Sequence, residues 1–231
     1  MRIPILFACF MAFTMLCPGL FAQDGATKAI RYDQHSGPHT FGAKAIHRAL
    51  AGASDANDYE ILTQLVEAGS GDIHKEGFAI RKTGKQIVIS GIDQTGIMYG
   101  MLELAEQIDM RGSLQEVQEG SQNPRFPFRA IKFNLPWSSY RRFEGLQANM
   151  EAARDLEMWR AFLDMMAENR FNTLTLWNLH PWPYLVRTKN FPDANPLSDE
   201  ELADWKQFWT GLFQMAKDRG IDTYLLNWNI L

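Results

Sequence analysis

The stretch Asn172-Thr173-Leu174-Thr175-Leu176-Trp177-Asn178-Leu179-His180-Pro181-Trp182 decides the fold. It begins as an apolar run with high strand propensity and ends in polar and aromatic residues closed by proline. Such a run predicts a buried strand whose carboxyl end opens into a loop. Two other stretches, 131–137 and 224–229, end in the same way. We therefore expect three strands with Asn and Trp side chains at their carboxyl ends.

Helical patterns separate the three predicted strands. Apolar side chains recur at helical spacing from about Asp155 to Arg170 and again from Ser198 to Ala216. Alternating strands and helices give parallel strands joined by right-handed crossovers. We therefore expect an α/β fold in which residues 128–231 are the first three βα units of an incomplete (β/α)8 barrel. A complete barrel needs about 250 residues, so we expect the chain to be a fragment or truncated product of a larger protein.

The first 22 residues have the pattern of a secretory signal peptide. Arg2 precedes an apolar stretch, 3–16, and Gly19-Leu20-Phe21-Ala22 is a plausible cleavage site before Gln23. The alternative is an uncleaved membrane anchor, which Pro18 and Gly19 disfavour. Both cysteines of the chain fall in this segment, so the mature protein is expected to have neither disulfide nor thiol chemistry. We predict a secreted or periplasmic protein.

Composition narrows the possible partners. The length of 231 residues allows one large or two modest domains, and 46% apolar residues are enough for a hydrophobic core. The formal net charge of −4 argues against a nucleic-acid partner. After residue 22 no segment is long and apolar enough to span a bilayer, so no membrane contact is expected after signal cleavage. The sequence shows neither a metal-ligand cluster nor a cofactor loop, and we predict no cofactor.

Residues 23–110 predict a small α+β domain of order β-α-β-β-β-α. The first strand is expected at 29–32, followed by a loop in which His35 and His39 are surface residues. Hairpin strands flank residues 82–85, and Asp93 is expected to cap the second helix rather than to form part of a phosphate-binding loop. The polar segment 111–127 shows no periodicity and is predicted to be an interdomain linker.

Two groups of motifs resemble secreted glycoside hydrolases. The segments 77–80, 87–91 and 96–106, with the signature Gly96-x-x-Tyr99-Gly100, resemble the small domain that precedes the catalytic barrel in β-N-acetylhexosaminidases and α-glucuronidases. The segments 129–134, 158–172 and 176–181 resemble the start of the barrel in α-glucuronidase-like hydrolases. The resemblance implies a structural small domain without catalytic residues. It also implies a hydrolase that acts on plant or microbial polysaccharide.

The predicted strand ends favour sugar binding over catalysis. Glycoside hydrolysis needs two carboxylates, and none of the three strand ends carries Asp or Glu. The resemblance places the catalytic carboxylates on later strands, so we assign no catalytic residue and expect the 231-residue chain to be inactive. Amides match sugar hydroxyls, and indole rings pack on sugar C–H faces. The predicted substrate-binding residues are Asn134, Trp137, Asn178, His180, Trp182, Asn227, Trp228 and Asn229.

Two alternatives accompany this assignment. Each Trp can instead pack in the core, and each Asn can instead close a βα turn; Trp159, Trp205 and Trp209 are expected to be core residues. Lys132 or Arg129 could pair with an acidic sugar such as glucuronate. Besides an α-glucuronidase-like hydrolase, the sequence is compatible with a non-catalytic exported glycan-binding protein or with a β-N-acetylhexosaminidase-like enzyme.

Overall fold

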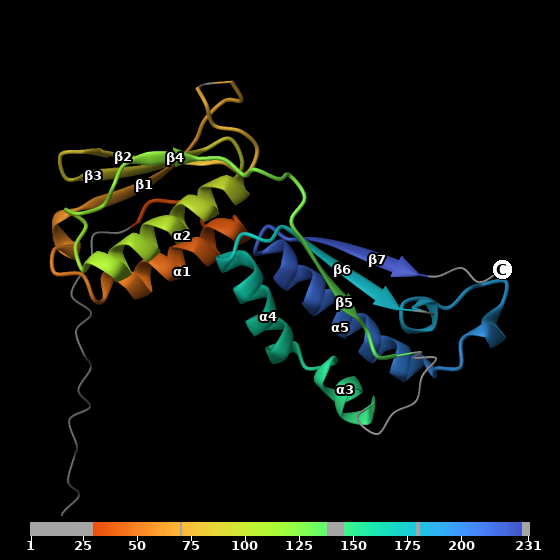
Figure 1. The fold of residues 1–231 in the computed structure, drawn as a ribbon. Helices are drawn as coiled ribbons and strands as arrows, with labels where there is room; N and C mark the ends of the chain where they lie inside the picture. The colour runs from red at the N-terminus through yellow and green to blue at the C-terminus, as the bar shows by residue number, and fades with distance from the viewer. Residues whose placement is uncertain (1–29, 70, 138–145, 179–180, 228–231) are drawn as a thin grey trace, which may run out of the picture.

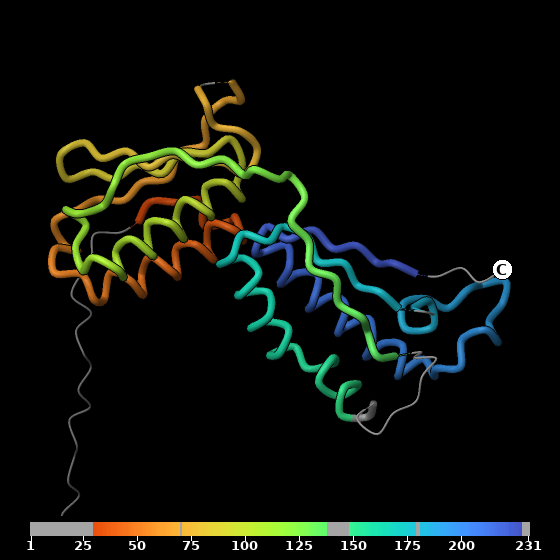
Figure 2. The backbone as a smooth tube through the Cα atoms, in the orientation of Figure 1, coloured from red at the N-terminus to blue at the C-terminus, as the bar shows by residue number. Residues whose placement is uncertain are grey.

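The computed structural model describes residues 30–69, 71–137, 146–178 and 181–227, which form two α/β parts joined at an angle (Figure 1). The first part contains a four-stranded sheet in the order β1-β3-β2-β4, and the second a three-stranded sheet in the order β5-β6-β7. Figure 2 shows that the chain passes once from the first part to the second. None of the described helices is long and apolar enough to cross a membrane.

The small domain is a sheet with two helices on one face. Its elements are α1 (Gly37–Leu50), η1 (Ala56–Asp58), β1 (Glu60–Leu65), β2 (Phe78–Thr83), β3 (Gln86–Gly91), α2 (Gln94–Arg111) and β4 (Gly120–Gln122). β1 pairs with β3 in parallel, and β2 pairs with β3 and β4 in antiparallel fashion. Helices α1 and α2 lie side by side against this sheet (Figure 1). The predicted hairpin and the Asp93 cap of α2 are confirmed.

Three expectations for this domain are corrected. The predicted linker contains β4, which extends the sheet at its β2 edge. Of the predicted strand at 29–32, the described residues form only an isolated bridge between Arg31 and Leu62. Helix α1 begins at Gly37, inside the segment that was expected to be a loop, because the Ser36 side chain caps it and a proline suits its first turn. His39 is therefore helical and 4% exposed rather than a surface loop residue.

The buried position of His39 predicts an acid-sensitive fold. Burial lowers the pKa of the imidazole, and the nearby Asp33 carboxylate opposes this only in part. Arg31, Tyr32 and Gln94 line the same cavity. Because the unfolded chain takes up a proton near pH 6.5 while folded His39 resists it, the free energy of unfolding should fall as pH drops below about 6.5 and level off below the folded pKa.

Urea denaturation at pH 7.5 and 5.0 measures this loss. In the variant His39→Phe the decrease between the two pH values should be smaller, since the titrating group is gone. If the variant loses as much free energy of unfolding as the parent chain, other groups cause the acid sensitivity.

The Gly96-x-x-Tyr99-Gly100 signature is explained by close packing of α2. A Cβ atom at Gly96 would lie 2.2 Å from the carbonyl oxygen of Gly77, and one at Gly100 would lie 2.5 Å from Cγ2 of Ile89. Both glycines thus let the helix approach the sheet and the turn before β2 more closely than any larger residue would. The signature therefore serves packing in this chain.

The second part alternates strands and helices. Its elements are β5 (Ala130–Asn134), α3 (Leu146–Ala152), α4 (Leu156–Glu168), β6 (Thr173–Asn178), η2 (Trp182–Tyr184), η3 (Pro192–Ala194), α5 (Asp199–Lys217) and β7 (Asp222–Asn227). The three strands are parallel, as predicted. Helices α4 and α5 cover one face of this sheet (Figure 1). The Ser198–Glu201 capping box at the start of α5 is also confirmed.

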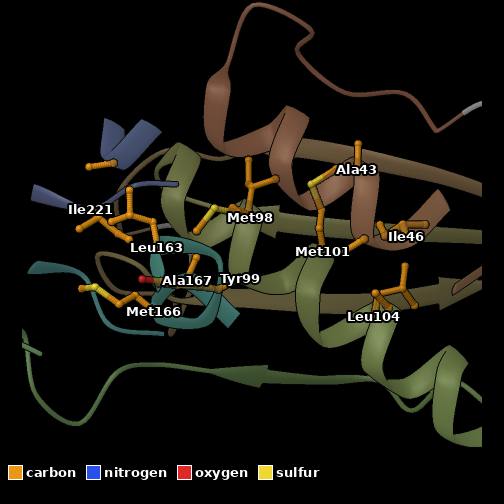
Figure 3. Close-up of a cluster of buried hydrophobic side chains, with 14 of the residues drawn as sticks. Ala43, Ile46, Met98, Tyr99, Met101, Leu104, Leu163, Met166, Ala167 and Ile221 are labelled. Atoms are coloured by element: carbon orange, nitrogen blue, oxygen red, sulfur yellow. The ribbon is translucent and has the colours of Figure 1, made fainter. Parts of the chain in front are cut away.

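One apolar core runs through both parts. Met98 and Tyr99 of α2 belong to the same buried cluster as Leu163 and Met166 of α4. Figure 3 shows these side chains together with Ile221, which immediately precedes β7. The contact lies at the amino ends of β5, β6 and β7, so the small domain supports the end of the sheet opposite to the strand tips that the sequence singled out.

Candidate functional site: the open face of the three-stranded sheet

The face of the β5-β6-β7 sheet that α4 and α5 leave uncovered carries two ordered rows of side chains. The register aligns Asn134, Trp177 and Leu226 at the carboxyl end, and Lys132, Thr175 and Tyr224 one layer below. Residues aligned across parallel strands point to the same side of a sheet. We call these six residues the open-face rows; Lys132, Asn134, Tyr224 and Leu226 among them are exposed.

The opposite parity of each strand faces the helices. Phe133 packs against Trp159 and Phe162 of α4, with ring centroids 4.7 and 5.8 Å apart. Leu174 and Leu176 are fully buried on the same side. β5 therefore has a polar set of side chains that faces away from the helices and an apolar set that faces them.

Of the four predicted asparagines the structure describes three, and it does not bring these three together. Asn134 lies on the open face, whereas Asn178 and Asn227 align with each other one position further along, on the helix-facing side. Asn178 is fully buried, and its Nδ2 donates to the Trp137 carbonyl oxygen at 2.6 Å. Asn178 thus fixes the segment after β5. This is the structural role that the sequence offered as an alternative to sugar binding. Asn134 and Asn178 therefore do not share one face of the sheet, because side chains alternate along a strand and the two residues have opposite parity.

Trp137 also has a structural environment. Its side chain is 1% exposed and lies among the rings of Tyr184, Trp205, Phe208 and Trp209, at centroid distances of 4.6 to 6.0 Å. A ring enclosed in this way has no face left for a sugar. Trp159, Trp205 and Trp209 are buried as expected.

The remaining predicted contacts divide into one exposed residue and three that the structure leaves undescribed. Trp182, in η2 after β6, is 47% exposed. His180, Trp228 and Asn229 lie outside the described residues. Their assignment stays a prediction.

Sequence reasoning missed Trp177 as a site residue. The indole lies on the open face, and the Lys132 ammonium is 5.4 Å from its ring centroid. A cation at this distance from an indole face is attracted to it. The signal was present in the sequence, since Trp177 has the parity opposite to Leu174 and Leu176. Residues of that parity are the ones that the helices cannot cover.

An aromatic pair closes the lower end of the open face. Phe128 and Tyr224 meet edge to face with centroids 6.3 Å apart. Phe128 belongs to the segment before β5, and Tyr224 belongs to β7. The pair therefore bridges over β6, which lies between those strands. The face therefore has an apolar floor and a polar, aromatic rim at the carboxyl ends of its strands.

The charges on this face suit binding of an anion better than acid–base catalysis. Lys132 is the cation of the open-face rows. Among the described residues of this face, the one carboxylate is Asp222, which aligns with Thr173 and Ala130 at the amino end of the sheet. Four residues of strand separate that row from Asn134, or about 13 Å. The described residues also contain no group of three or more His, Cys, Asp and Glu that could hold a metal ion.

Arg129, the other predicted partner of an acidic sugar, is unavailable. All three of its guanidinium nitrogens donate to protein acceptors at the amino end of β5. Lys132 is thus the basic residue of the predicted pair that reaches the open face.

Comparison with solved structures identifies relatives of this arrangement. The chain matches a GH138 enzyme targeting pectin rhamnogalacturonan II with a TM-score of 0.74 and 26% identity, over 87% of this chain and 31% of that one. The chain has a glycoside-hydrolase-like fold. A family 20 β-N-acetylglucosaminidase matches with a TM-score of 0.53, and a mutant β-hexosaminidase of Streptomyces plicatus bound to GlcNAc with 0.50, each at 13% identity.

These matches cover most of this chain and a minor share of the relatives. The two hexosaminidase-type structures align over 87% and 85% of this chain and over 38% and 40% of their own. The chain therefore spans between about a third and two fifths of the length of the hydrolases that it resembles. Neither a protein-family model nor a curated protein matches it.

Proposed function

We propose that this chain is the N-terminal part of an exported glycoside hydrolase, α-glucuronidase-like in acting on an acidic polysaccharide. In this proposal β5, β6 and β7 begin a (β/α)8 barrel, and the open-face rows line its interior. The similarity to the GH138 enzyme, at 26% identity over 87% of the chain, carries the proposal. The exposed apolar side chains of Tyr224 and Leu226 support it, since a barrel interior would cover them.

The chemistry of the rim favours a sugar that carries a carboxylate. The GH138 relative is described as targeting pectin rhamnogalacturonan II, and a galacturonan contains uronic acids. In the proposed site the Lys132 ammonium pairs with the uronate carboxylate, the Trp177 ring packs on the sugar's C–H face, and the Asn134 amide binds hydroxyls. This division of roles assigns charge selectivity to Lys132 and general sugar affinity to Trp177.

The substitution Lys132→Met tests the charge selectivity. It should weaken binding of an oligogalacturonate about tenfold, since loss of one partly exposed charge-assisted contact is worth about 1.4 kcal/mol. Binding of a neutral xylo-oligosaccharide should not change. Titration calorimetry on the full chain measures both affinities.

Lys44→Met is the matched control, because Lys44 is an exposed lysine on α1, away from the sheet. It should leave both affinities unchanged. Equal weakening of neutral and acidic ligands by Lys132→Met would argue against a uronate partner.

Catalysis is expected to require residues that this chain does not supply. Since none of the described residues at the carboxyl ends of β5, β6 and β7 is a carboxylate, the 231-residue chain should not turn over aryl glycosides at a rate above that of a heat-denatured sample. A release assay with aryl uronides and aryl N-acetylglucosaminides measures this. Turnover that survives repurification would place catalytic groups within the chain.

The lack of a carboxylate among the described residues at the three strand ends also favours a second candidate, a non-catalytic glycan-binding protein. A rim with amide, indole and ammonium groups but no carboxylate can hold a sugar without cleaving it. The two candidates differ in what the natural protein does to its ligand. Hydrolysis of oligogalacturonate by protein purified from its natural source would support the hydrolase, and binding without product would support the second candidate.

A further inference from the structure

One carboxylate in the small domain holds the starts of two strands in the other sheet. Glu76, in the turn before β2, accepts a hydrogen bond from Nη2 of Arg129 at 2.5 Å. Both of its carboxylate oxygens also accept from Nδ2 of Asn172, at 3.0 Å each. Arg129 immediately precedes β5 and Asn172 immediately precedes β6. Glu76 is thus the common partner of the two strand starts.

The two strand residues are also tied to each other. The Arg129 N–H donates to Oδ1 of Asn172 at 2.9 Å, and the Asn172 N–H donates to the Arg129 carbonyl oxygen at 3.0 Å. The Arg129 guanidinium donates from Nε to the Arg170 carbonyl at 2.6 Å and from Nη1 to the Phe126 carbonyl at 2.7 Å. The side chains of Glu76, Arg129 and Asn172 are largely buried, so these bonds are shielded from competing water.

Glu76 itself is fixed by the capping residue of α2. Its backbone N–H donates to Oδ2 of Asp93 at 2.7 Å, while Oδ1 of Asp93 caps the helix by accepting from the Gly96 N–H at 2.7 Å. Glu76 adopts a φ of 61°, a conformation that glycine tolerates better than other residues. Glycine would lack the carboxylate that Arg129 and Asn172 bind. The backbone geometry and the side chain therefore serve the same contact.

The sheet needs such an anchor because its side-chain pattern alone allows an alternative pairing. A shift of β5 against β6 by one residue would turn every side chain to the wrong face, but a shift by two residues preserves the alternation. Such a shift, about 6.6 Å, would keep Ile131 and Phe133 toward the helices. It would remove Asn134 from its place beside Trp177.

We propose that Glu76 is a positioning residue that sets the register of β5 against β6 and thereby places Asn134 beside Trp177 at the rim. This inference deepens the proposed sugar site, but its test contains no sugar. A failure of the sugar-binding proposal would therefore leave it standing, and its own failure would leave the rim chemistry untouched.

Engineered cysteine pairs report the register directly. In a chain whose two natural cysteines, Cys9 and Cys17, are replaced by serine, the pair Lys132→Cys with Thr175→Cys matches the observed register. The pair Lys132→Cys with Thr173→Cys matches the shifted one. Neighbouring strands lie about 4.8 Å apart, which suits a disulfide, whereas a two-residue offset puts the Cα atoms beyond about 7 Å. Mass spectrometry after mild oxidation gives the yield for each pair.

The parent background should give at least tenfold more of the in-register disulfide. Glu76→Ala should lower that ratio by threefold or more. Glu103→Ala is the matched control, since Glu103 pairs with Arg170 across the same interface but touches neither strand. An unchanged ratio in Glu76→Ala, or an equal fall in Glu103→Ala, would overturn the proposal.

A milder pair of variants covers the case in which Glu76→Ala does not fold. Glu76→Gln keeps an acceptor for Asn172 and loses the charge that binds Arg129, so it should lower the ratio in part. Glu103→Gln should leave it unchanged. If the ratio in Glu76→Gln equals that in Glu103→Gln, Glu76 does not set the register.

Discussion

Replacing Trp137 with alanine is expected to lower the free energy of unfolding by about 3–5 kcal/mol. The indole is 1% exposed and contacts four aromatic rings, three of them from α5. Its removal would leave a large cavity between the end of β5 and that helix, which the rigid neighbouring rings cannot refill. The midpoint of urea denaturation, followed by far-UV circular dichroism, measures the loss.

Trp182→Ala is the control for this prediction. Trp182 is 47% exposed, so its removal should change the free energy of unfolding by no more than about 1 kcal/mol. Comparing the two variants distinguishes a tryptophan of the hydrophobic core from one on an exposed surface. If Trp137→Ala had unchanged stability but reduced affinity for sugar, Trp137 would be a binding residue and not a core residue.

The second large effect is expected for Arg129→Ala. The variant leaves the Glu76 carboxylate, 11% exposed, without its cationic partner, and breaking a buried ion pair on one side costs about 3–5 kcal/mol. The backbone carbonyls of Phe126 and Arg170 also lose their donors. Urea denaturation of the full chain again measures the change.

A double-mutant cycle distinguishes this mechanism from simple loss of packing. Combining Arg129→Ala with Glu76→Ala removes the stranded charge, so the double variant should be less destabilised than the sum of the two single variants. Arg160→Ala breaks an exposed ion pair with Glu157 on α4 and should cost no more than about 0.5 kcal/mol. Additive effects of Arg129→Ala and Glu76→Ala would show that no buried charge is left uncompensated.

Local periodicity predicted the elements of this fold because each pattern has a direct physical cause. The stripe Trp159, Leu163 and Met166 follows the 3.6-residue helical repeat and is buried in α4 as expected. The alternation in 130–134 follows the two-residue strand repeat. β4 escaped prediction because Gly120, Ser121 and Gln122 carry no apolar alternation; they form a strand only through pairing with β2.

The candidate site was predicted less well because it depends on register between strands. Asn134 and Asn178 both end apolar runs, yet Asn134 aligns with Trp177 and Asn178 falls on the other face. Each run shows its own parity, since Asn134 is opposite to Phe133 and Asn178 shares the parity of Leu176. Neither run shows which residues of the two strands lie side by side. The same holds for Glu76, whose partner Asn172 lies 96 residues away in the chain. No local pattern connects such a pair.

The position of Glu76 ahead of both its partners has a consequence for how the protein is made. Synthesis delivers the N-terminal residues first, so Glu76, Asp93 and the whole of α2 leave the ribosome before Arg129 and Asn172 do. The small-domain groups that bind the two strand starts are therefore already synthesised when β5 emerges. Each new strand of the second sheet can then dock onto small-domain residues that were made before it.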